Sequence, residues 1–508
     1  MHAAVDSFKR FYEKRRPLVV YEKSVVQNDE CTFFLVKEGA DRKIVILSRG
    51  SMLRPVKDFE VAEYSKFRVG DDAYVFAVCP FSHANVSVLR RVFHFLCPQT
   101  SGLKVAVGMG DRIGLATPGH IRAAKAGVFP VFAQQSVREL SRTARTFDDV
   151  LDDVTWAVFQ EGYRDGFGAD ADHLKSIDDV ERAVSAGYTM FTVDPSEYVD
   201  NDVERYGLDK IAEKFEALPW DDLGCDVEGF QDLYVGKRVS VRGDAFVFER
   251  ESLIRMAVKY SAAISFAAKV FWRVKTILGN EDFDFEVSVD ETDVPTSPEE
   301  HVFIALELRR LGVKVTSLAL RFVGKFEKAI DYIGDLKEFE ESFKKHVSIA
   351  RSLGPYKISI HSGSDKFSIF PILGKHASDL IHLKTAGTSY LEALRIVARH
   401  EPALFREIVL FALQRFEEDR KAYYVTTDLS RIPDPNKILD SELEPTYLDE
   451  SNGRQLLHIT YGSVLTTKKS GGEWVYRERI HRCLIEHEEE FYETVAKHLR
   501  CHIEAIWS

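Results

Sequence analysis

The first 98 residues carry hydrophobic and polar positions in short alternating runs. These runs are "VVYEKSVV", "CTFFLVKEG", "RKIVILSRG" and "AYVFAVCP", and such runs are typical of β-strands joined by turns. One segment, "VSVLRRVFHFL", favours a helix. We therefore predict a small α+β region over residues 1–98.

From about residue 103 the pattern changes to eight β-rich runs that alternate with amphipathic helices. The runs are "LKVAVGMGD", "GVFPVFAQQS", "DGFGADADHLK", "GYTMFTVDPS", "FDFEVSVDETD", "VTSLALRFVG", "YKISIHSGSD" and "DLIHLKTAG". One helix, "SPEEHVFIALELRRLG", begins with a capping box formed by Ser297 and Glu300, with Pro298 in its first turn. Eight successive strand–helix units predict a closed (β/α)8 barrel, or TIM barrel, over residues 99–390.

Two segments lie outside this repeat of strand and helix. Residues 200–280, between the fourth and fifth runs, indicate inserted helices, which we interpret as a lid or packing subdomain. Residues 391–508 are mostly helical in pattern. The predicted fold class is thus α/β, a TIM barrel with a small N-terminal α+β region and a C-terminal helical extension.

Composition narrows the cellular setting and the partners. The 508 residues carry a net charge of -12, and an acidic protein repels the phosphates of nucleic acid. Six scattered cysteines with no Cys-x-x-Cys spacing favour a reducing cytoplasm. The charged N-terminus is unlike a signal peptide, and no apolar run reaches the length of a membrane span. We expect a cytoplasmic protein, open to forming a homo-oligomer, that acts on a small molecule.

Polar residues stand at the carboxyl end of every predicted strand, where barrels of this kind place their chemistry. In chain order they are Asp111 and Arg112; Gln134 and Gln135; Asp172, His173 and Lys175; Asp194; Glu286, Asp290 and Glu291; Arg321; His361, Ser362, Asp365 and Lys366; and His382 and Lys384. Eight polar ends in register are hard to attribute to solvation alone. They predict one shared site.

Strand alternation indicates which of these side chains face inward. In "FDFEVSVDE" the phenylalanines and valines share one face, so Glu286 points into the barrel. The same rule turns His361 and His382 inward. A buried carboxylate needs a cation, a metal or a proton. Glu286 is therefore either a group that acts in catalysis or an ion-pair partner of Arg321 or Lys384.

Three histidines at strand ends predict a metal site. His173, His361 and His382 could converge, and three imidazoles with an open position suit Zn, Mn, Co or Ni. A single inward histidine is more often a residue of the core. Two roles stay open for Asp172, which either acts in catalysis or orients His173.

The motif "GMGDRIG" follows a strand and precedes a helix, which invites a nucleotide-binding interpretation. Its third glycine stands one residue late for Gly-x-Gly-x-x-Gly, and no Gly-Lys-Ser/Thr follows. We therefore expect no dinucleotide cofactor.

Longer motifs carry a specific resemblance. The segments "GMGDRIGLATPGHIRA", "FAQQSVREL", "WAVFQEGYRDGFGADADHLKS", "VSVDETDVPTSPEEH" and "HSGSDKFSIFPILGKH" together resemble the tagaturonate epimerase (tagaturonate/fructuronate epimerase) family. The resemblance runs from about residue 105 to 390 and continues more loosely into the C-terminal helices. It implies interconversion of two six-carbon keto-uronates in hexuronate metabolism, with a divalent metal.

The implied reaction inverts a carbon β to a ketone, whose hydrogen is not acidic. Either transient oxidation or retro-aldol cleavage can invert it, and the sequence offers no convincing nicotinamide site. Retro-aldol chemistry needs a Lewis acid and acid/base groups. A metal on His173, His361 and His382 would supply the first, and Asp172 and Glu286, on different strands, would supply the second. Candidate substrate contacts are Asp111, Arg112, Gln134, Gln135, Lys175, Asp194, Arg321, Ser362, Asp365 and Lys384.

Three alternatives stay open. A class II (metal-dependent) ketose aldolase on the same scaffold would release its fragments. An enolising isomerase would exchange solvent hydrogen next to the carbonyl. A sugar-acid-binding barrel would have no activity.

Overall fold

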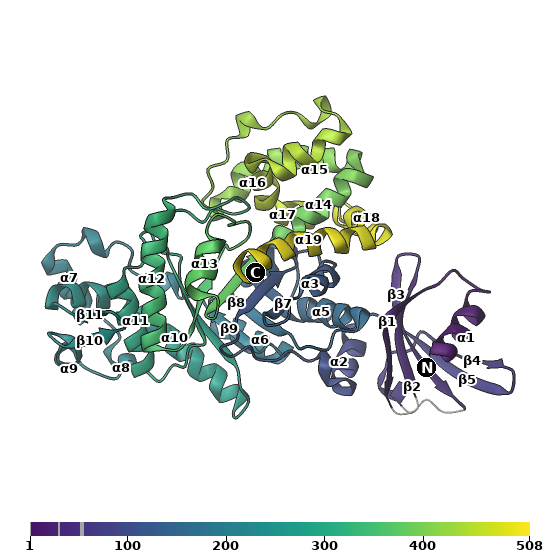
Figure 1. Ribbon diagram of the computed structural model, residues 1–508, viewed down its shortest axis with the longest axis horizontal. Coiled ribbons are helices and arrows are strands. Elements are labelled where there is room, and N and C mark those ends of the chain that lie inside the picture. The colour runs from purple at the N-terminus through teal and green to yellow at the C-terminus, as the bar shows by residue number, and fades with distance from the viewer. Residues whose placement is uncertain (1, 29–30, 51–54, 508) are drawn as a thin grey trace.

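The computed structural model describes residues 2–28, 31–50 and 55–507. Among these, no helix combines the length and apolar character that a membrane crossing requires. An N-terminal sheet, a central barrel with its insertion, and a C-terminal helical layer follow one another along the chain (Figure 1).

The N-terminal region is a five-stranded antiparallel sheet of order β1-β2-β3-β5-β4. Its elements are α1 (His2–Tyr12), β1 (Val19–Asn28), β2 (Cys31–Glu38), β3 (Asp41–Arg49), β4 (Glu63–Val69), β5 (Asp72–Pro80) and α2 (His83–Val92). One face of the sheet packs on α1 through Phe8, Phe34 and Phe76. The opposite face, with Phe33 and Ile46, joins the main core. The predicted α+β region is present, and α1 and β4 are additions to the predicted strands.

Eight parallel strands close into a barrel of order β12-β13-β14-β15-β6-β7-β8-β9. They are β6 (Ala106–Gly110), β7 (Phe129–Ser136), β8 (Gly168–Leu174), β9 (Met190–Val193), β12 (Asp284–Val289), β13 (Ser317–Leu320), β14 (Lys357–Ile360) and β15 (Ile381–Ala386). The last strand pairs with the first, with Lys384 opposite Gly108. Each of the eight predicted runs contains one of these strands, so the barrel prediction is confirmed.

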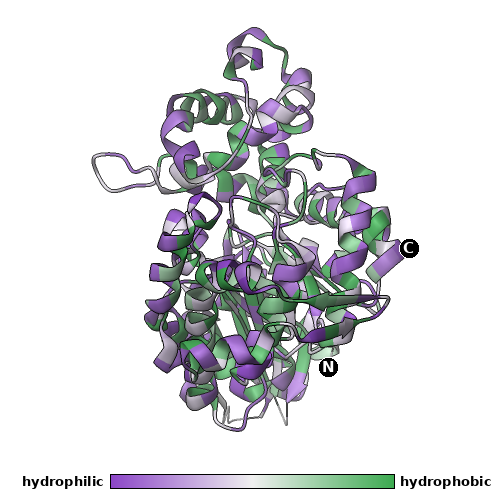
Figure 2. Cartoon of the chain, turned by 90° about the vertical axis from the view of Figure 1, so that its left-hand side faces the viewer, coloured by the Kyte–Doolittle hydropathy of each residue, from purple (hydrophilic) through white to green (hydrophobic). Residues whose placement is uncertain are grey.

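Helices surround the barrel and bury its outward-facing side chains. They are α3 (Thr117–Ala123), α4 (Val137–Thr143), α5 (Phe147–Glu161), α6 (Ile177–Ala186), α11 (Pro298–Arg310), α12 (Leu336–Leu353), α13 (Phe370–Ala377) and α14 (Thr388–His400). Helix α11 begins with the predicted capping box, since Ser297 and Glu300 exchange side-chain and backbone hydrogen bonds. Hydrophilic and hydrophobic stretches alternate along these helices (Figure 2), as expected for helices with one buried face.

The insertion between β9 and β12 contains helices and one hairpin. Its elements are α7 (Leu208–Glu216), α8 (Trp220–Leu223), α9 (Val227–Tyr234), β10 (Arg238–Val241), β11 (Asp244–Val247) and the long α10 (Arg250–Leu278). The β10–β11 hairpin was not predicted. The insertion lies at the left of the molecule in Figure 1, on the side opposite the N-terminal sheet.

The C-terminal extension is helical, as predicted. It comprises α15 (Pro402–Asp419), α16 (Ser451–Ile459), α17 (Tyr461–Thr466), α18 (Arg477–Glu486) and α19 (Glu488–Trp507). Helix α19 packs so closely on α3 that a Cβ at Gly119 would lie 2.8 Å from the carbonyl oxygen of Tyr492. In Figure 1 the helices α15, α16 and α17 form a separate layer above the barrel.

Candidate active site

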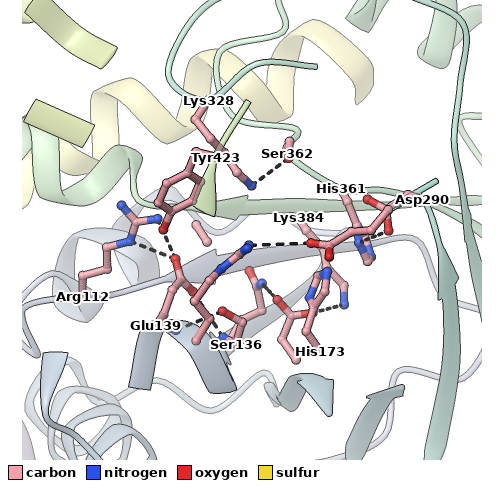
Figure 3. A pocket seen from close by; sticks show the side chains of 15 residues that line it. Arg112, Ser136, Glu139, His173, Asp290, Lys328, His361, Ser362, Lys384 and Tyr423 are labelled. Atoms are coloured by element: carbon pink, nitrogen blue, oxygen red, sulfur yellow. Dashed lines mark hydrogen bonds and ion pairs between the residues drawn. The ribbon is translucent and has the colours of Figure 1, made fainter. Parts of the chain in front are cut away.

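A pocket lies at the carboxyl ends of the barrel strands and is lined almost entirely by polar side chains (Figure 3). Seven predicted residues line it: Arg112, Gln134, Asp172, His173, His361, Ser362 and Lys384. The other lining residues are Ser136, Arg138, Glu139, Asp290, Glu291, Lys328, Ala386 and Tyr423. The strand ends therefore do converge on one site.

Lys384, on β15, is the buried cation at the floor of this pocket. Its ammonium lies 2.7 Å from Asp170, 2.8 Å from Asp172 and 2.9 Å from Glu286. Burial alone would lower the pKa of Lys384, but these three carboxylates outweigh burial and raise that pKa well above its usual value. Lys384 is therefore a permanent charge that holds acids from β8 and β12 together.

Glu286 lies fully buried on β12 and faces the barrel interior, as strand alternation predicts. Its carboxylate accepts from His361 Nε2 at 2.6 Å and also from the Ser317 hydroxyl. Burial would raise its pKa, but Lys384 and the imidazole of His361 hold that pKa well below its usual value. Glu286 is not among the lining residues, so it acts on the pocket through His361 and Lys384.

A backbone irregularity brings Asp172 and His173 to the pocket together. Neighbouring strand residues normally point to opposite faces, but the pairing of β8 with β9 shifts register between Ala171 and Leu174. His173 adopts a φ of 53° inside this shift, a conformation rare for residues other than glycine. A bulge re-aims a side chain in this way, and here it adds an imidazole to the face that carries Asp172.

His173, His361 and Asp290 form a group suited to a metal ion. Their ligand atoms all lie within 4.8 Å of one another, and the two imidazole rings have centroids 4.9 Å apart. The Nδ1 atoms of His173 and His361 lie 2.9 Å from Asp172 and 3.2 Å from Asp290, yet neither is in hydrogen-bonding geometry. Orphaned buried nitrogens beside a carboxylate fit a divalent cation of the Zn, Mn, Co or Ni type.

His382 lies one inward-facing position deeper than His361. It pairs in register with Ser359 on β14, and its Nδ1 is 3.3 Å from Glu286. Burial lowers its pKa to about 4. Among the described residues, the structure groups Asp290 rather than His382 with the other two histidines.

Comparisons with known proteins show the family of this chain. The family model described as UxaE, tagaturonate epimerase, matches residues 21–506. The chain belongs to the tagaturonate epimerase family. It is 45% identical over 502 residues to the tagaturonate/fructuronate epimerase of Thermotoga maritima, covering 99% of this chain and 98% of that protein. Crystal structures of the fructuronate-tagaturonate epimerase UxaE from Cohnella laeviribosi, native and with one glycerol, each superimpose with a TM-score of 0.89 at 37% identity. They cover 100% of this chain and 99% of theirs. Membership in this family makes the chain an isomerase of the epimerase type.

Six predicted substrate contacts of this epimerase do not line the pocket: Asp111, Gln135, Lys175, Asp194, Arg321 and Asp365. Asp111 accepts from the backbone amides of Ile113, Gly114 and Ala116, so it shapes the turn after β6. The amide of Gln135 is buried away from the pocket, because the alternation that turns Gln134 inward turns Gln135 outward.

Lys175 and Asp194 pair with each other at 3.3 Å beside the pocket. Asp194 also forms a second group of potential ligand atoms with His173 and Glu291. Arg321 is only partly buried. Its backbone amide donates to the Thr296 hydroxyl and its carbonyl accepts from the Thr296 amide.

Asp365 ties the loop after β14 to the C-terminal helices of the epimerase. Its carboxylate lies 2.9 Å from Arg454 and 2.8 Å from His498, and its amide donates to His502. Burial would raise its pKa, but Arg454 and His498 hold that pKa well below its usual value. This loop starts with His361 and Ser362, so the extension fixes residues of the pocket.

Replacing Asp365 with asparagine is expected to lower the free energy of unfolding by about 3–5 kcal/mol, because Arg454 is left buried without its carboxylate. The depressed pKa of Asp365 also predicts the direction in which stability changes with pH. The stabilisation is present above the unfolded pKa of about 3.9 and is lost as pH falls through the folded value. Urea unfolding at pH 7 measures the first effect, and a series from about pH 4 down to about pH 2 measures the second. Equal stability of D365N and wild type at pH 7 would contradict the assignment.

Several lining residues had been given no catalytic, metal-binding or substrate-binding role from the sequence, although Asp290 and Glu291 were among the polar strand ends. Asp290 continues the inward alternation of β12 beyond the strand, so the pattern contained a signal for it. Arg138 and Glu139 start α4 just after β7 and had a weaker signal. Lys328 and Tyr423 come from a loop after β13 and from the C-terminal extension, and no local pattern indicates either.

Proposed function

We propose that this chain interconverts D-tagaturonate and D-fructuronate by retro-aldol cleavage and re-addition, with a divalent cation in the pocket. The observation that carries the proposal is the group formed by His173, His361 and Asp290 beside the buried acids of β8 and β12. The likeness to relatives named for this reaction supports it.

The proposed reaction breaks the bond between the carbon next to the ketone and the carbon that is inverted. The hydroxyl on the inverted carbon gives its proton to a base, and that carbon becomes an aldehyde. The electron pair of the broken bond stays on the ketone fragment as an enediolate. After the aldehyde turns, the enediolate adds to its other face and the proton returns to the new hydroxyl.

His173, His361 and Asp290 would hold the cation. Such a cation supplies Lewis-acid stabilisation of the enediolate charge. The deeper carboxylate of Glu286 orients His361 through its 2.6 Å contact, the usual role of a carboxylate behind a metal-binding histidine.

Asp172 is the carboxylate placed to exchange the hydroxyl proton, because it lines the pocket and Glu286 does not. Gln134 donates to its Oδ2 at 3.1 Å and Lys384 contacts its Oδ1 at 2.8 Å. Burial would raise the pKa of Asp172, but His173 and Lys384 outweigh it and keep the group ionised. It is therefore in the unprotonated form that the first step requires.

Proton NMR of tagaturonate incubated with metal-loaded and chelated protein tests the proposal. We expect fructuronate to appear with the loaded protein, at least about 100-fold more slowly after chelation, and to return when metal is restored. Free aldehyde without epimer would indicate an aldolase instead. No conversion with any of the four metals would indicate a binding protein.

A further inference from the structure

Lys328 is a partly buried cation that faces the pocket without a carboxylate partner. Its ammonium donates to the Ser362 hydroxyl at 2.7 Å, and among the described residues no carboxylate lies within ion-pair distance of it. Withdrawing an ammonium even partly from water is unfavourable unless an anion compensates it. The pocket therefore has room for a negative charge that the chain does not supply.

Two arginines line the same pocket as Lys328, and each of them has a carboxylate partner. Arg112 is neutralised by Glu139 at 2.6 Å and stacks on Tyr461. Arg138 lies over the ring of Tyr423 at 5.0 Å and pairs with Glu291 at 3.7 Å, so Lys328 differs from both arginines in having no carboxylate partner among the described residues. Burial and the positive charge of Arg138 lower the pKa of Lys328, and a bound anion would relieve both effects.

Lys328 lies near the histidines that would hold the cation, because its hydrogen-bond partner is next to one of them. Ser362, its hydrogen-bond partner, directly follows His361, so their Cα atoms are about 3.8 Å apart. In Figure 3 Lys328 and Ser362 lie above the pocket, and His173 lies below it. A six-carbon acid with its ketone end at His173 and His361 therefore brings its carboxylate toward Lys328.

We propose that Lys328 binds the substrate carboxylate and keeps the aldehyde fragment in the pocket between cleavage and re-formation of the bond. This inference rests on the proposed retro-aldol reaction. Cleavage yields a three-carbon ketone fragment, the enediolate of dihydroxyacetone, and a three-carbon aldehyde that carries the carboxylate. The carboxylate belongs to the aldehyde fragment, which has to turn. An enzyme that keeps this carboxylate bound retains the fragment and acts as an epimerase, whereas one that loses it acts as an aldolase.

Lysine suits this task better than arginine does. Its ammonium is a point charge on a flexible stem with three rotatable donors, whereas the planar guanidinium fixes a carboxylate in one orientation. A fragment held by Lys328 can turn its aldehyde carbon while its charge stays bound. K328R should therefore keep substrate affinity but invert the carbon more slowly.

The test compares K328M, K328R and K328Q with wild type, each loaded with metal. Epimer is followed by NMR, and released dihydroxyacetone is measured enzymatically. For K328M and K328Q we expect KM for tagaturonate to rise about 10- to 100-fold, the range for losing a charged hydrogen bond, and dihydroxyacetone to accumulate. K328R should return KM to within about threefold of wild type with a lower kcat.

Lys325 on the same loop provides the matched control, because it is exposed and lies over the ring of Tyr424. K325M should retain wild-type KM and release no fragment. Thermal unfolding of every variant checks the fold, and K328Q, which keeps a donor for Ser362, replaces K328M if the latter unfolds.

Wild-type KM with no released dihydroxyacetone in K328M and K328Q would overturn the inference, and so would a raised KM with no release. A wild-type protein that does not convert tagaturonate would instead overturn the proposed function. The two failures are therefore distinguishable.

Discussion

Replacing Lys384 with methionine is expected to be the most damaging single change in the barrel. It leaves Asp170, Asp172 and Glu286 buried without their shared cation. Removing one partner of a buried ion pair costs about 3–5 kcal/mol, and three acids share this one. We expect K384M to lose at least that much free energy of unfolding and more than about 100-fold in kcat/KM. Urea unfolding and the epimerisation assay measure the two effects.

Two comparison variants sharpen this result. Lys175 pairs with Asp194 but is 40% exposed in its side chain, so K175M should cost less than about 1 kcal/mol. Asp170 is the acid that most readily takes up a proton, because burial raises its pKa to about 6. D170N therefore removes a carboxylate that is already easily protonated, and we expect this variant to fold. A K384M protein as stable as K175M would contradict the role of Lys384.

The second large effect is expected for H361A, which removes a potential metal ligand and the partner of Glu286. Changes behind a metal ligand already cost 10- to 100-fold in metal affinity or activity, so loss of the ligand should exceed about 100-fold. Metal content after dialysis and the initial rate of epimerisation measure it. H83A, at an exposed histidine of the N-terminal region, is the control. Full metal content and near-wild-type rate in H361A would contradict the site.

The same measurement decides the third ligand. The strand pattern favours His382, whereas the geometry groups Asp290 with His173 and His361. If the geometry holds, D290A loses the metal and H382A keeps it. The reverse result would restore the ligand set suggested by the sequence.

The barrel was predictable because each strand and helix is a local pattern. Alternation along β12 placed Glu286 inside, and Ser297 with Glu300 marked the start of α11. The same alternation fails at His173, because the register shift in β8 depends on the neighbouring strand. The polar strand ends predicted where the pocket lies and seven of the side chains that line it. They did not separate these from Gln135 and Asp111, which serve the core or the backbone instead.

The sequence by itself determined the strand–helix order, the inward face of β12, β14 and β15, and the family. These are local or near-local properties, set by period and by capping. Tertiary structure alone decided that Lys384 joins three acids, that Asp290 stands with two histidines, and that Lys328 and Tyr423 reach the pocket. The physical reason is distance along the chain. Lys328 and Tyr423 reach the same pocket only when the C-terminal layer packs over the barrel mouth. No local sequence pattern around either residue predicts that contact.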